Sequence, residues 1–172
     1  TTQKIKLSLQ AGEKIHLKGA NGEGKSTLLK MIDQSQSTEI FFTGQSLYLD
    51  QNFSLLNDDL SVIENLAKFN PDLLEVEWRN LLGQLRIRRE KALLKLGQLS
   101  GGEKLKVALL GISQHHQNID LLLLDEPENH LDIESQELLA QAIEQFKGAV
   151  ILVSHDDCFV KQSGVNEAFL LS

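Results

Sequence analysis

The apolar residues of the chain recur with the periods of two kinds of element, strands and helices. Apolar and polar residues alternate over residues 5–9 and 15–17, which predicts two short strands joined by a turn at Gln10–Glu13. Two further stretches, Ile119–Leu124 and Ala149–Val153, are unbroken apolar runs, as expected for strands covered on both faces. The remaining expected strands are Glu39–Thr43, Ser46–Leu49 and Glu167–Leu171.

Apolar residues spaced three and four positions apart predict the helices. The expected helices are Ser26–Ile32, Leu73–Leu85, Gly102–Ser113 and Ile133–Phe146. Strands lie near both ends of the chain, and a mostly helical segment, at approximately residues 54–99, lies between them. This order predicts a single α/β domain over residues 1–172 whose core carries a helical insertion.

The composition agrees with one ordinary globular domain, since 41% of the 172 residues are hydrophobic and 24% are charged. A chain of this length buries roughly two-thirds of its unfolded surface, so it needs neither disulfides nor a structural metal. The single cysteine, Cys158, favours a reducing compartment. No apolar run approaches the roughly 20 residues of a membrane span, which excludes an integral membrane protein for this chain. A cytoplasmic location is therefore expected.

The net charge of −7 hides an uneven distribution of charged residues. Eight basic and two acidic residues lie between Arg79 and Lys106, whereas ten acidic residues and one basic residue lie between Gln117 and Asp157. The basic stretch is either a solvated helix face or a surface that meets phosphates or a partner, and the sequence leaves both open. An acidic chain is a poor autonomous binder of nucleic acid, because phosphate contacts dominate that affinity.

Residues 19–26 match the pattern G-x-x-x-x-G-K-[ST] between an expected strand and an expected helix. A loop that wraps phosphates needs the backbone angles that glycine permits, and its amides form an anion site at the helix N-terminus. Lys25 would reach the outer phosphates, and the Ser26 hydroxyl would hold Mg²⁺. The sequence therefore predicts a site for a nucleoside triphosphate such as ATP. Its expected residues are Gly19, Ala20, Asn21, Gly22, Glu23, Gly24, Lys25, Ser26 and Thr27.

Two carboxylates follow the apolar strand at Leu121–Leu124. A buried strand would carry Asp125 to the carboxyl edge of the sheet, where its charge can hold Mg²⁺ through water. Glu126 comes next and points differently, so it can orient and deprotonate an attacking water. The pair therefore predicts hydrolysis rather than binding alone.

Three smaller features carry weaker signals. Gln51 follows a strand and could ligate the metal or a water, although a glutamine in a loop usually has no special role. His155 follows Ala149–Val153 and could contact a γ-phosphate, although a lone histidine is more often a capping or core residue. The segment Leu99–Glu103 opens a helix with a hydroxyl N-cap and two glycines, which makes it a second potential anion site.

Together these segments resemble the conserved motifs of ATP-binding-cassette (ABC) ATPases, in the order that the family has them. Gly19–Ser26 resembles the Walker A motif, Gln51 the Q-loop, Leu99–Glu103 the signature, Leu121–Glu126 the Walker B motif, Asn129–Asp132 the D-loop and His155 the switch histidine. The resemblance implies a P-loop NTPase fold with a mainly parallel core sheet, a small antiparallel β part and a helical subdomain.

The same resemblance implies how the site works. Two cassettes pair head to tail with two ATP molecules between them, so that each ATP lies on one Walker A motif and under the partner's signature. Ser26, Gln51 and Asp125 would hold Mg²⁺, while Glu126, His155 and Gln51 would be the catalytic residues. The signature residues acting in trans would be Ser100, Gly101, Gly102 and Glu103.

Within the family, residues 121–135 together with 99–104, 48–51 and 153–156 look like the ABC-F subfamily. Those proteins carry two cassettes in one polypeptide, have no transmembrane domain and act on the ribosome in translation. The resemblance implies that this chain is one cassette, the second of the two, and that parts outside it contact the ribosome. Two other functions stay open: the motor subunit of a membrane transporter, and a nucleotide-gated binding module with negligible hydrolysis.

Glu128 departs from the subfamily pattern, which usually has threonine at this position. If the side chain faced the site, it would raise the pKa values of the neighbouring acids by like-charge repulsion. It is expected instead to point to solvent or to the partner cassette. The chain is also expected to lack the upstream aromatic residue on which the family stacks adenine.

Overall fold

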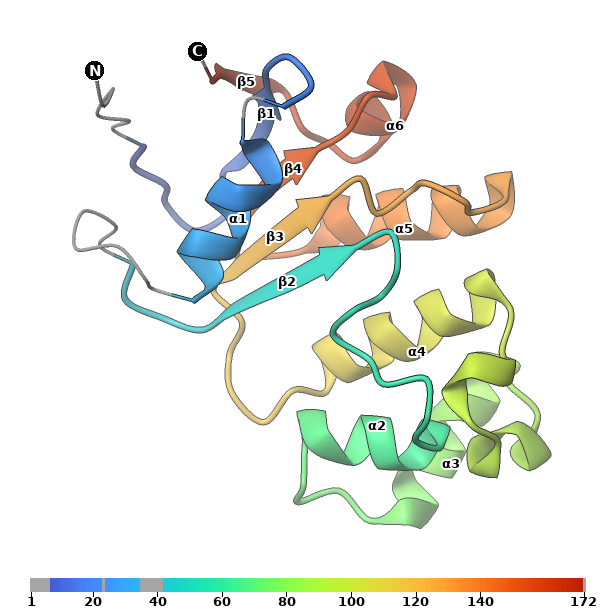
Figure 1. Cartoon of the computed structure of the whole chain (residues 1–172). Helices are drawn as coiled ribbons and strands as arrows, with labels where there is room; N and C mark the ends of the chain where they lie inside the picture. The colour runs from blue at the N-terminus through green and yellow to red at the C-terminus, as the bar shows by residue number, and fades with distance from the viewer. Residues whose placement is uncertain (1–6, 23, 35–41, 172) are drawn as a thin grey trace.

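A computed structural model of the chain describes residues 7–22, 24–34 and 42–171. In this part of the chain five strands form one sheet, in which every neighbouring pair is parallel and the order is β2-β3-β4-β1-β5 (Figure 1). The strands are β1 (Lys14–Lys18), β2 (Ser46–Asp50), β3 (Leu121–Asp125), β4 (Ala149–Val153) and β5 (Glu167–Leu170).

The central strands β3 and β4 are apolar because both of their faces are covered. Successive side chains of a strand point to opposite faces, so each strand contributes to two separate cores. Leu122 and Leu124 belong to the core that includes α4 (Gly101–Ser113) and α5 (Ile133–Gln145). Leu121 and Leu123 belong to the other core, together with α1 (Lys25–Asp33). The helix that follows β1 therefore lies on the opposite face of the sheet from α4.

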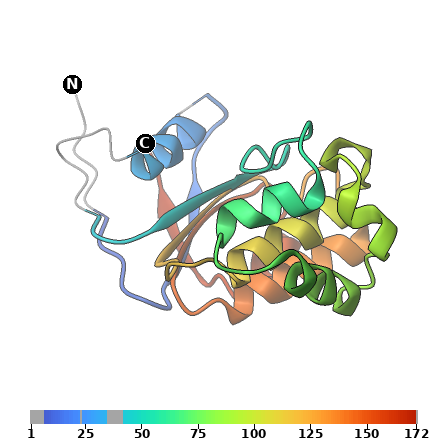
Figure 2. The same cartoon turned by 90° about the horizontal axis from the view of Figure 1, so that it is seen from below.

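The segment between β2 and α4 is helical and packs on α4. It contains α2 (Val62–Phe69), α3 (Glu75–Gln84) and two 3-10 helices, η1 (Arg89–Leu93) and η2 (Leu96–Gln98). Figures 1 and 2 show α4 between α2 and α5, so one continuous core runs from the sheet into this segment. A last short helix, α6 (Asp157–Gln162), lies between β4 and β5.

Four helices, α2, α4, α5 and α6, begin at side-chain caps that the sequence supplies. Ser61 and Ser100 each accept a hydrogen bond from the amide of a glutamate three residues later, and that glutamate side chain accepts from the cap amide in return. Asp132 accepts from the amide of Ser135 at the start of α5. These caps satisfy backbone amides that the helix itself leaves unpaired.

The strands expected at 15–17, Ser46–Leu49, Ile119–Leu124, Ala149–Val153 and Glu167–Leu171 are confirmed, with shifts of up to two residues at their ends. The four expected helices are likewise confirmed as α1, α3, α4 and α5. The sequence analysis missed α2 and α6. Both are short; α2 lies within the segment expected to be mostly helical, and Val62, Leu66 and Phe69 at helical spacing after the Ser61–Glu64 capping box could have revealed it.

The small antiparallel β part is absent from the described residues. Residues 7–10 form no strand, and the expected strand Glu39–Thr43 lies outside the described residues except for 42–43, which form none. The expected turn is present, with the amide of Glu13 bonded to Gln10 O at 3.1 Å. However, β4 and β5 already occupy both edges of β1, so no edge remains for an antiparallel partner. No helix of the described residues is long and apolar enough to cross a membrane.

Candidate functional site

Four segments with functional side chains meet at one edge of the sheet. Because all strands are parallel, the carboxyl ends of β1, β2, β3 and β4 lie at the same edge, where open α/β sheets bind ligands (Figure 1). The phosphate loop follows β1, Gln51 follows β2, Glu126 follows β3 and His155 follows β4. The topology therefore gathers residues that lie more than 100 positions apart in the sequence.

The phosphate loop connects β1 to α1 through glycines in left-handed conformations. Gly22 has φ 86° and Gly24 has φ 83°, and the latter is the residue before the helix starts. Lys25 is only 8% exposed, and its ammonium donates to the carbonyl oxygens of Gly19 at 2.6 Å and Ala20 at 3.0 Å. Asn21, Ser26 and Thr27 are exposed, and Glu23 lies outside the described residues.

The loop has the electrostatics of an anion site. Among the described residues no carboxylate pairs with Lys25, and the partners of its ammonium in this part of the chain are neutral carbonyl groups. A buried charge without an opposite charge is costly, and a bound phosphate would remove that cost. The N-terminus of α1 adds its own preference for negative charge.

Asp125 ends β3 and is held by a residue on the neighbouring strand. The Tyr48 hydroxyl donates to Asp125 Oδ2 at 2.8 Å. Burial raises the pKa of Tyr48 above its ordinary value, as do this hydrogen bond and the negative charge of Asp125. The other carboxylate oxygen, Oδ1, has no hydrogen-bond partner in the part of the chain that the structure describes. One oxygen is thus fixed and the other remains for a ligand.

Glu126 lies in a network of side chains from three segments, which follow β2, β3 and β4. Its Oε1 lies 2.9 Å from His155 Nε2, and its Oε2 accepts from Asn129 Nδ2 at 2.7 Å. Asn129 Nδ2 also donates to Gln51 Oε1 at 3.1 Å. The network therefore joins the ends of β2, β3 and β4 around one carboxylate.

The backbone of Glu126 adopts a strained conformation that orients its side chain. Its φ is 48°, a left-handed conformation that costs a residue with a side chain about 1–2 kcal/mol. The amide of Glu126 donates to Val153 O at 2.8 Å, and its carbonyl accepts from the amide of Asn129 at 3.2 Å. These bonds hold the turn that aims the carboxylate at His155.

Glu128 is not exposed, so the expectation that it points to solvent or to a partner is wrong. Its side chain is 3% exposed and accepts a hydrogen bond from the Ser154 hydroxyl, while its Oε2 has no partner among the described residues. Burial raises the pKa of Glu128, and the negative charges of Glu126 and Asp156 act in the same direction. The turn after Glu126 brings residue 128 against the end of β4, which a reading of the sequence along one strand does not reveal.

The signature segment is not near the phosphate loop of its own chain. Ser100 caps α4, and α4 lies on the face of the sheet opposite α1. A side chain at Gly102 would lie 2.6 Å from Ser135 Oγ, so the glycine allows α4 to approach the start of α5. Glu103 forms an ion pair with Lys91, and this hydrogen-bonded pair lowers the pKa of Glu103.

The donor set at the edge fits Mg²⁺ better than a transition metal. Asp125 offers one free carboxylate oxygen, Ser26 is exposed, and the amide oxygen of Gln51 is already bonded to Asn129. In the described part of the chain no group of three or more His, Cys, Asp or Glu side chains could hold a metal. Mg²⁺ typically takes one or two protein oxygens together with substrate phosphates and water. The residues present therefore fit this ion.

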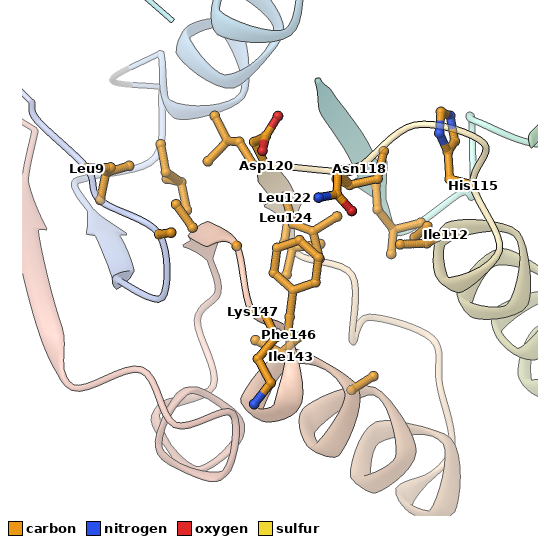
Figure 3. Close-up of a pocket in the computed structure, with 18 of the residues that line it drawn as sticks. Leu9, Ile112, His115, Asn118, Asp120, Leu122, Leu124, Ile143, Phe146 and Lys147 are labelled. Carbon is orange, nitrogen blue, oxygen red and sulfur yellow. The ribbon is translucent and has the colours of Figure 1, made fainter. Parts of the chain in front are cut away.

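A cavity with a volume of about 1240 Å³ lies elsewhere. Figure 3 shows Leu9, Asp120, Phe146 and other labelled residues around it. Its lining comes from the segments that precede β1, β3 and β4, at the edge opposite the phosphate loop, and from the neighbouring helices. Of the described site residues none lines this cavity, so it is not the nucleotide site.

The sequence analysis missed two residues that shape the site. Tyr48 is a polar residue in an apolar strand, and it pairs with Leu123, two positions before Asp125. A hydroxyl in such a strand could have indicated its contact with Asp125. Ser154 directly follows β4 and is 7% exposed, but its link to Glu128 depends on the fold.

Comparison with known proteins gives one consistent family. Residues 2–129 match the family described as "ABC transporter". The chain is 38% identical to ABC transporter F family member 5 of Arabidopsis thaliana, over 93% of this chain and 24% of that protein. It is 38% identical to ATP-binding cassette sub-family F member 3 of Mus musculus, over 92% and 23%. It is 39% identical to the probable ATP-binding protein YheS of Escherichia coli K12, over 88% and 24%. The chain thus spans about a quarter of the length of these curated relatives.

Solved structures show the same fold. One is the RNase-L Inhibitor, with a TM-score of 0.68 and 25% identity over 93% of this chain and 32% of that one. Another is the ATP-binding cassette MJ0796 in a dimeric post-hydrolysis state bound to ADP and Pi, with a TM-score of 0.71 and 22% identity over 96% and 84%.

Proposed function

Because this chain belongs to the family of ATP-binding-cassette ATPases, we propose that it binds ATP on its phosphate loop and hydrolyses it with Glu126 as the general base. The observation that carries the proposal is the network that holds the Glu126 carboxylate between His155 and Asn129 at the carboxyl edge of the sheet. A base must be oriented before it can take a proton from water, and this network orients it.

Each residue of the edge has a separate task in this proposal. Lys25 releases its bonds to the loop carbonyls and binds the outer phosphates, together with the loop amides. His155 contacts the γ-phosphate from the end of β4. Because it also contacts Glu126, it couples phosphate binding to the position of that carboxylate. Gln51 links this state to the helical segment, because it is bonded to Asn129 and directly precedes that segment.

Mg²⁺ would be held by Asp125 and Ser26, with Gln51 on the same side, and it would neutralise phosphate charge during the reaction. Tyr48 fixes the orientation of Asp125 for this purpose. The oxygen that Tyr48 leaves free is the one that would face the ion or its bound water.

A second cassette completes each site. Ser100, Gly101, Gly102 and Glu103 lie on the far side of the sheet from the chain's own phosphate loop, so they cannot contact an ATP bound there. The same segment of a partner cassette would cover that ATP instead. We therefore expect the chain, a cassette with a helical subdomain at approximately residues 54–99, to hydrolyse ATP only when paired.

The cassette belongs, in our proposal, to an ABC-F-type protein that acts on the ribosome in translation, as its second cassette. The similarity to relatives named as members of the F family supports this class. The chain spans about a quarter of each relative, so a second cassette and the parts that contact the ribosome would lie outside it. The motor subunit of a membrane transporter is the rival class, and it predicts co-purification with transmembrane partners.

The test is the substitution Glu126→Gln in the complete protein. It should lower ATP turnover about 10²- to 10⁴-fold, because it removes the general base. ATP should still bind and should hold the paired cassettes closed. Glu137→Gln is the matched control, since Glu137 lies exposed on α5, and it should leave turnover unchanged.

Two results would contradict the proposal. Unchanged turnover in the Glu126→Gln variant would show that another group is the base. Absence of ribosome binding in the presence of ATP in both variants, tested by cosedimentation, would remove the assignment to translation. If the wild-type protein bound ribosomes only with ATP but showed no measurable ATP turnover, the nucleotide-gated binding module would be favoured over the ATPase.

A further inference from the structure

Glu128 is a buried acid beside the site that no step of the proposed reaction uses. Its side chain is 3% exposed, its Oε1 accepts from the Ser154 hydroxyl, and its Oε2 is buried without a hydrogen-bond partner among the described residues. A carboxylate in such a place would keep its charge with only one bond, which is costly. A carboxylic acid has lower cost there, because it carries no charge.

The groups that face Glu128 favour the neutral form. Glu126 on the same turn and Asp156 after β4 are both acidic, and both raise the pKa of Glu128, although burial raises it more. The bond from Ser154 and the backbone act in the opposite direction but do not reverse the shift. From α5 the nearest contact is neutral, since Gln136 Nε2 donates to Glu128 O at 3.4 Å. No cation is paired with Glu128 in the described part of the chain.

Ser154 connects Glu128 to the segment that carries His155. The Ser154 hydroxyl donates to Glu128 and accepts from the Asp156 amide at 3.0 Å. Its carbonyl lies 2.9 Å from Nε2 of His16, a buried histidine on β1. Ser154, the residue before His155, thus has three hydrogen-bonding contacts. Glu128 supplies the one that comes from the turn after Glu126.

We propose that Glu128 is a positioning residue that holds Ser154 and thereby keeps His155 in contact with Glu126. The inference rests on the proposed function of Glu126 and His155, but the bond that it concerns exists in the nucleotide-free chain. Glu128 and Glu126 lie on one turn, and Ser154 and His155 are neighbours in the chain. The two contacts therefore tie the same two segments together.

The proposal predicts a dependence on pH with a defined sign. A raised pKa means that the folded chain holds this proton more tightly than the unfolded chain does. The stabilisation is complete below the ordinary pKa of glutamate, about 4.3, and is lost as pH rises through the folded-state value. At high pH a third negative charge would then stand beside Glu126 and Asp156, and the hold on Ser154 would weaken.

The experiment compares four variants with the wild type. Glu128→Gln keeps the shape and an acceptor oxygen but cannot ionise, whereas Glu128→Ala and Ser154→Ala remove one side of the bond. Glu137→Gln, exposed on α5, is the matched control for loss of one carboxylate. The thermal midpoint of the nucleotide-free chain is measured from pH 5 to 9, and ATP turnover of the complete protein is measured over the same range.

At the acid end of the range, Glu128→Gln should have the thermal midpoint and the ATP turnover of the wild type. As pH rises, both quantities should fall less in this variant than in the wild type. Glu128→Ala and Ser154→Ala should each lower turnover about tenfold, as expected for one lost positioning bond. A Glu128→Gln profile parallel to that of the wild type and of Glu137→Gln would contradict the raised pKa of Glu128 and the pH dependence drawn from it. Wild-type turnover in Glu128→Ala would overturn the positioning role. If Glu126→Gln kept full turnover, the proposed function would fail, while the thermal profiles would still decide the state of Glu128.

Discussion

Replacing Tyr48 by phenylalanine should separate the role of its hydroxyl from the role of its ring. The hydroxyl donates to Asp125 Oδ2 at 2.8 Å, whereas the ring packs against the core on the α1 face and lies 5.8 Å from the Lys30 ammonium. Phenylalanine keeps the ring and its contacts with that core and with Lys30. The substitution therefore removes one hydrogen bond and little else.

The magnitude follows from the kind of bond that is lost. A hydrogen bond to a charged group contributes about 1.5–3 kcal/mol, and the lower figure applies here because Tyr48 is half-buried. At about 2–4 °C per kcal/mol for a chain of this size, the thermal midpoint should fall by about 3–6 °C. Residues that orient a metal ligand typically affect metal affinity 10- to 100-fold, so the affinity for Mg²⁺ with ATP should fall about tenfold.

The assay needs a control that loses a similar bond away from the site. Ser46 lies on the same strand, and its hydroxyl donates to Asp33 Oδ1 at 2.8 Å. Ser46→Ala should also lower the free energy of unfolding, but it should leave Mg²⁺-dependent nucleotide affinity unchanged. Calorimetric titration with ATP, with and without Mg²⁺, would measure the difference between the two variants.

The effect of Tyr48→Phe on stability should also depend on pH. The folded-state pKa of Tyr48 is raised, so its contribution is complete below the ordinary value of about 10 and is lost as pH rises above it. The gap between wild type and variant should stay constant from pH 7 to about 10 and then close. Equal unfolding free energies at pH 7, together with equal Mg²⁺-dependent affinities, would refute the claim that the hydroxyl holds Asp125.

Two further predictions concern the helical segment and α4. Gly111→Ala should destabilise the chain by about 1–3 kcal/mol, because the new Cβ would lie 2.6 Å from the Phe69 ring, whereas Gly83→Ala, with no atom within 4 Å, should stabilise α3 by up to about 1 kcal/mol. Urea unfolding measures both, and equal shifts would contradict the packing between α2 and α4. Glu103→Gln should lower the thermal midpoint at pH 7 by about 2 °C, since the pair with Lys91 is partly exposed. The lowered pKa of Glu103 means that this difference is present above about pH 4.3 and disappears as pH falls through the folded-state value, so a constant difference down to pH 3 would argue against the ion pair.

The phosphate loop and the central strands could be predicted from the sequence because their signals are local. The spacing of Gly19, Gly24 and Lys25 encodes the loop by itself, and the apolar runs of β3 and β4 encode burial on both faces. Such patterns depend on residues a few positions apart. The six-residue helix α6 is too short for such a pattern, whereas α2 carries one, in its Ser61–Glu64 capping box and its apolar residues Val62, Leu66 and Phe69.

The antiparallel part and Glu128 show what local patterns do not contain. Alternation over residues 5–9 predicts a strand, but whether that strand has a partner depends on which strands occupy the edges of β1. Glu128 follows two acidic residues and a proline, a context typical of an exposed turn. Its burial arises from Ser154, which lies 26 positions away and meets it only when β3 and β4 pair.

The site combines local signals, which the sequence contains, with contacts that only the fold creates. Gln51, Asn129 and His155 each carry a weak signal in the sequence, since an isolated residue of any of these types is common at a strand end. The parallel sheet removes the ambiguity, because it brings the ends of β2, β3 and β4 to one edge. There Asn129 and His155 contact the Glu126 carboxylate, and Gln51 contacts Asn129. Asn129 and His155 hold different oxygens of the carboxylate, and Gln51 holds Asn129, so loss of one contact would loosen the orientation of Glu126. The position of the carboxylate therefore depends on the network as a whole, and Glu128 extends this network by holding the segment at the end of β4, which the contacts of Gln51 and Asn129 do not reach.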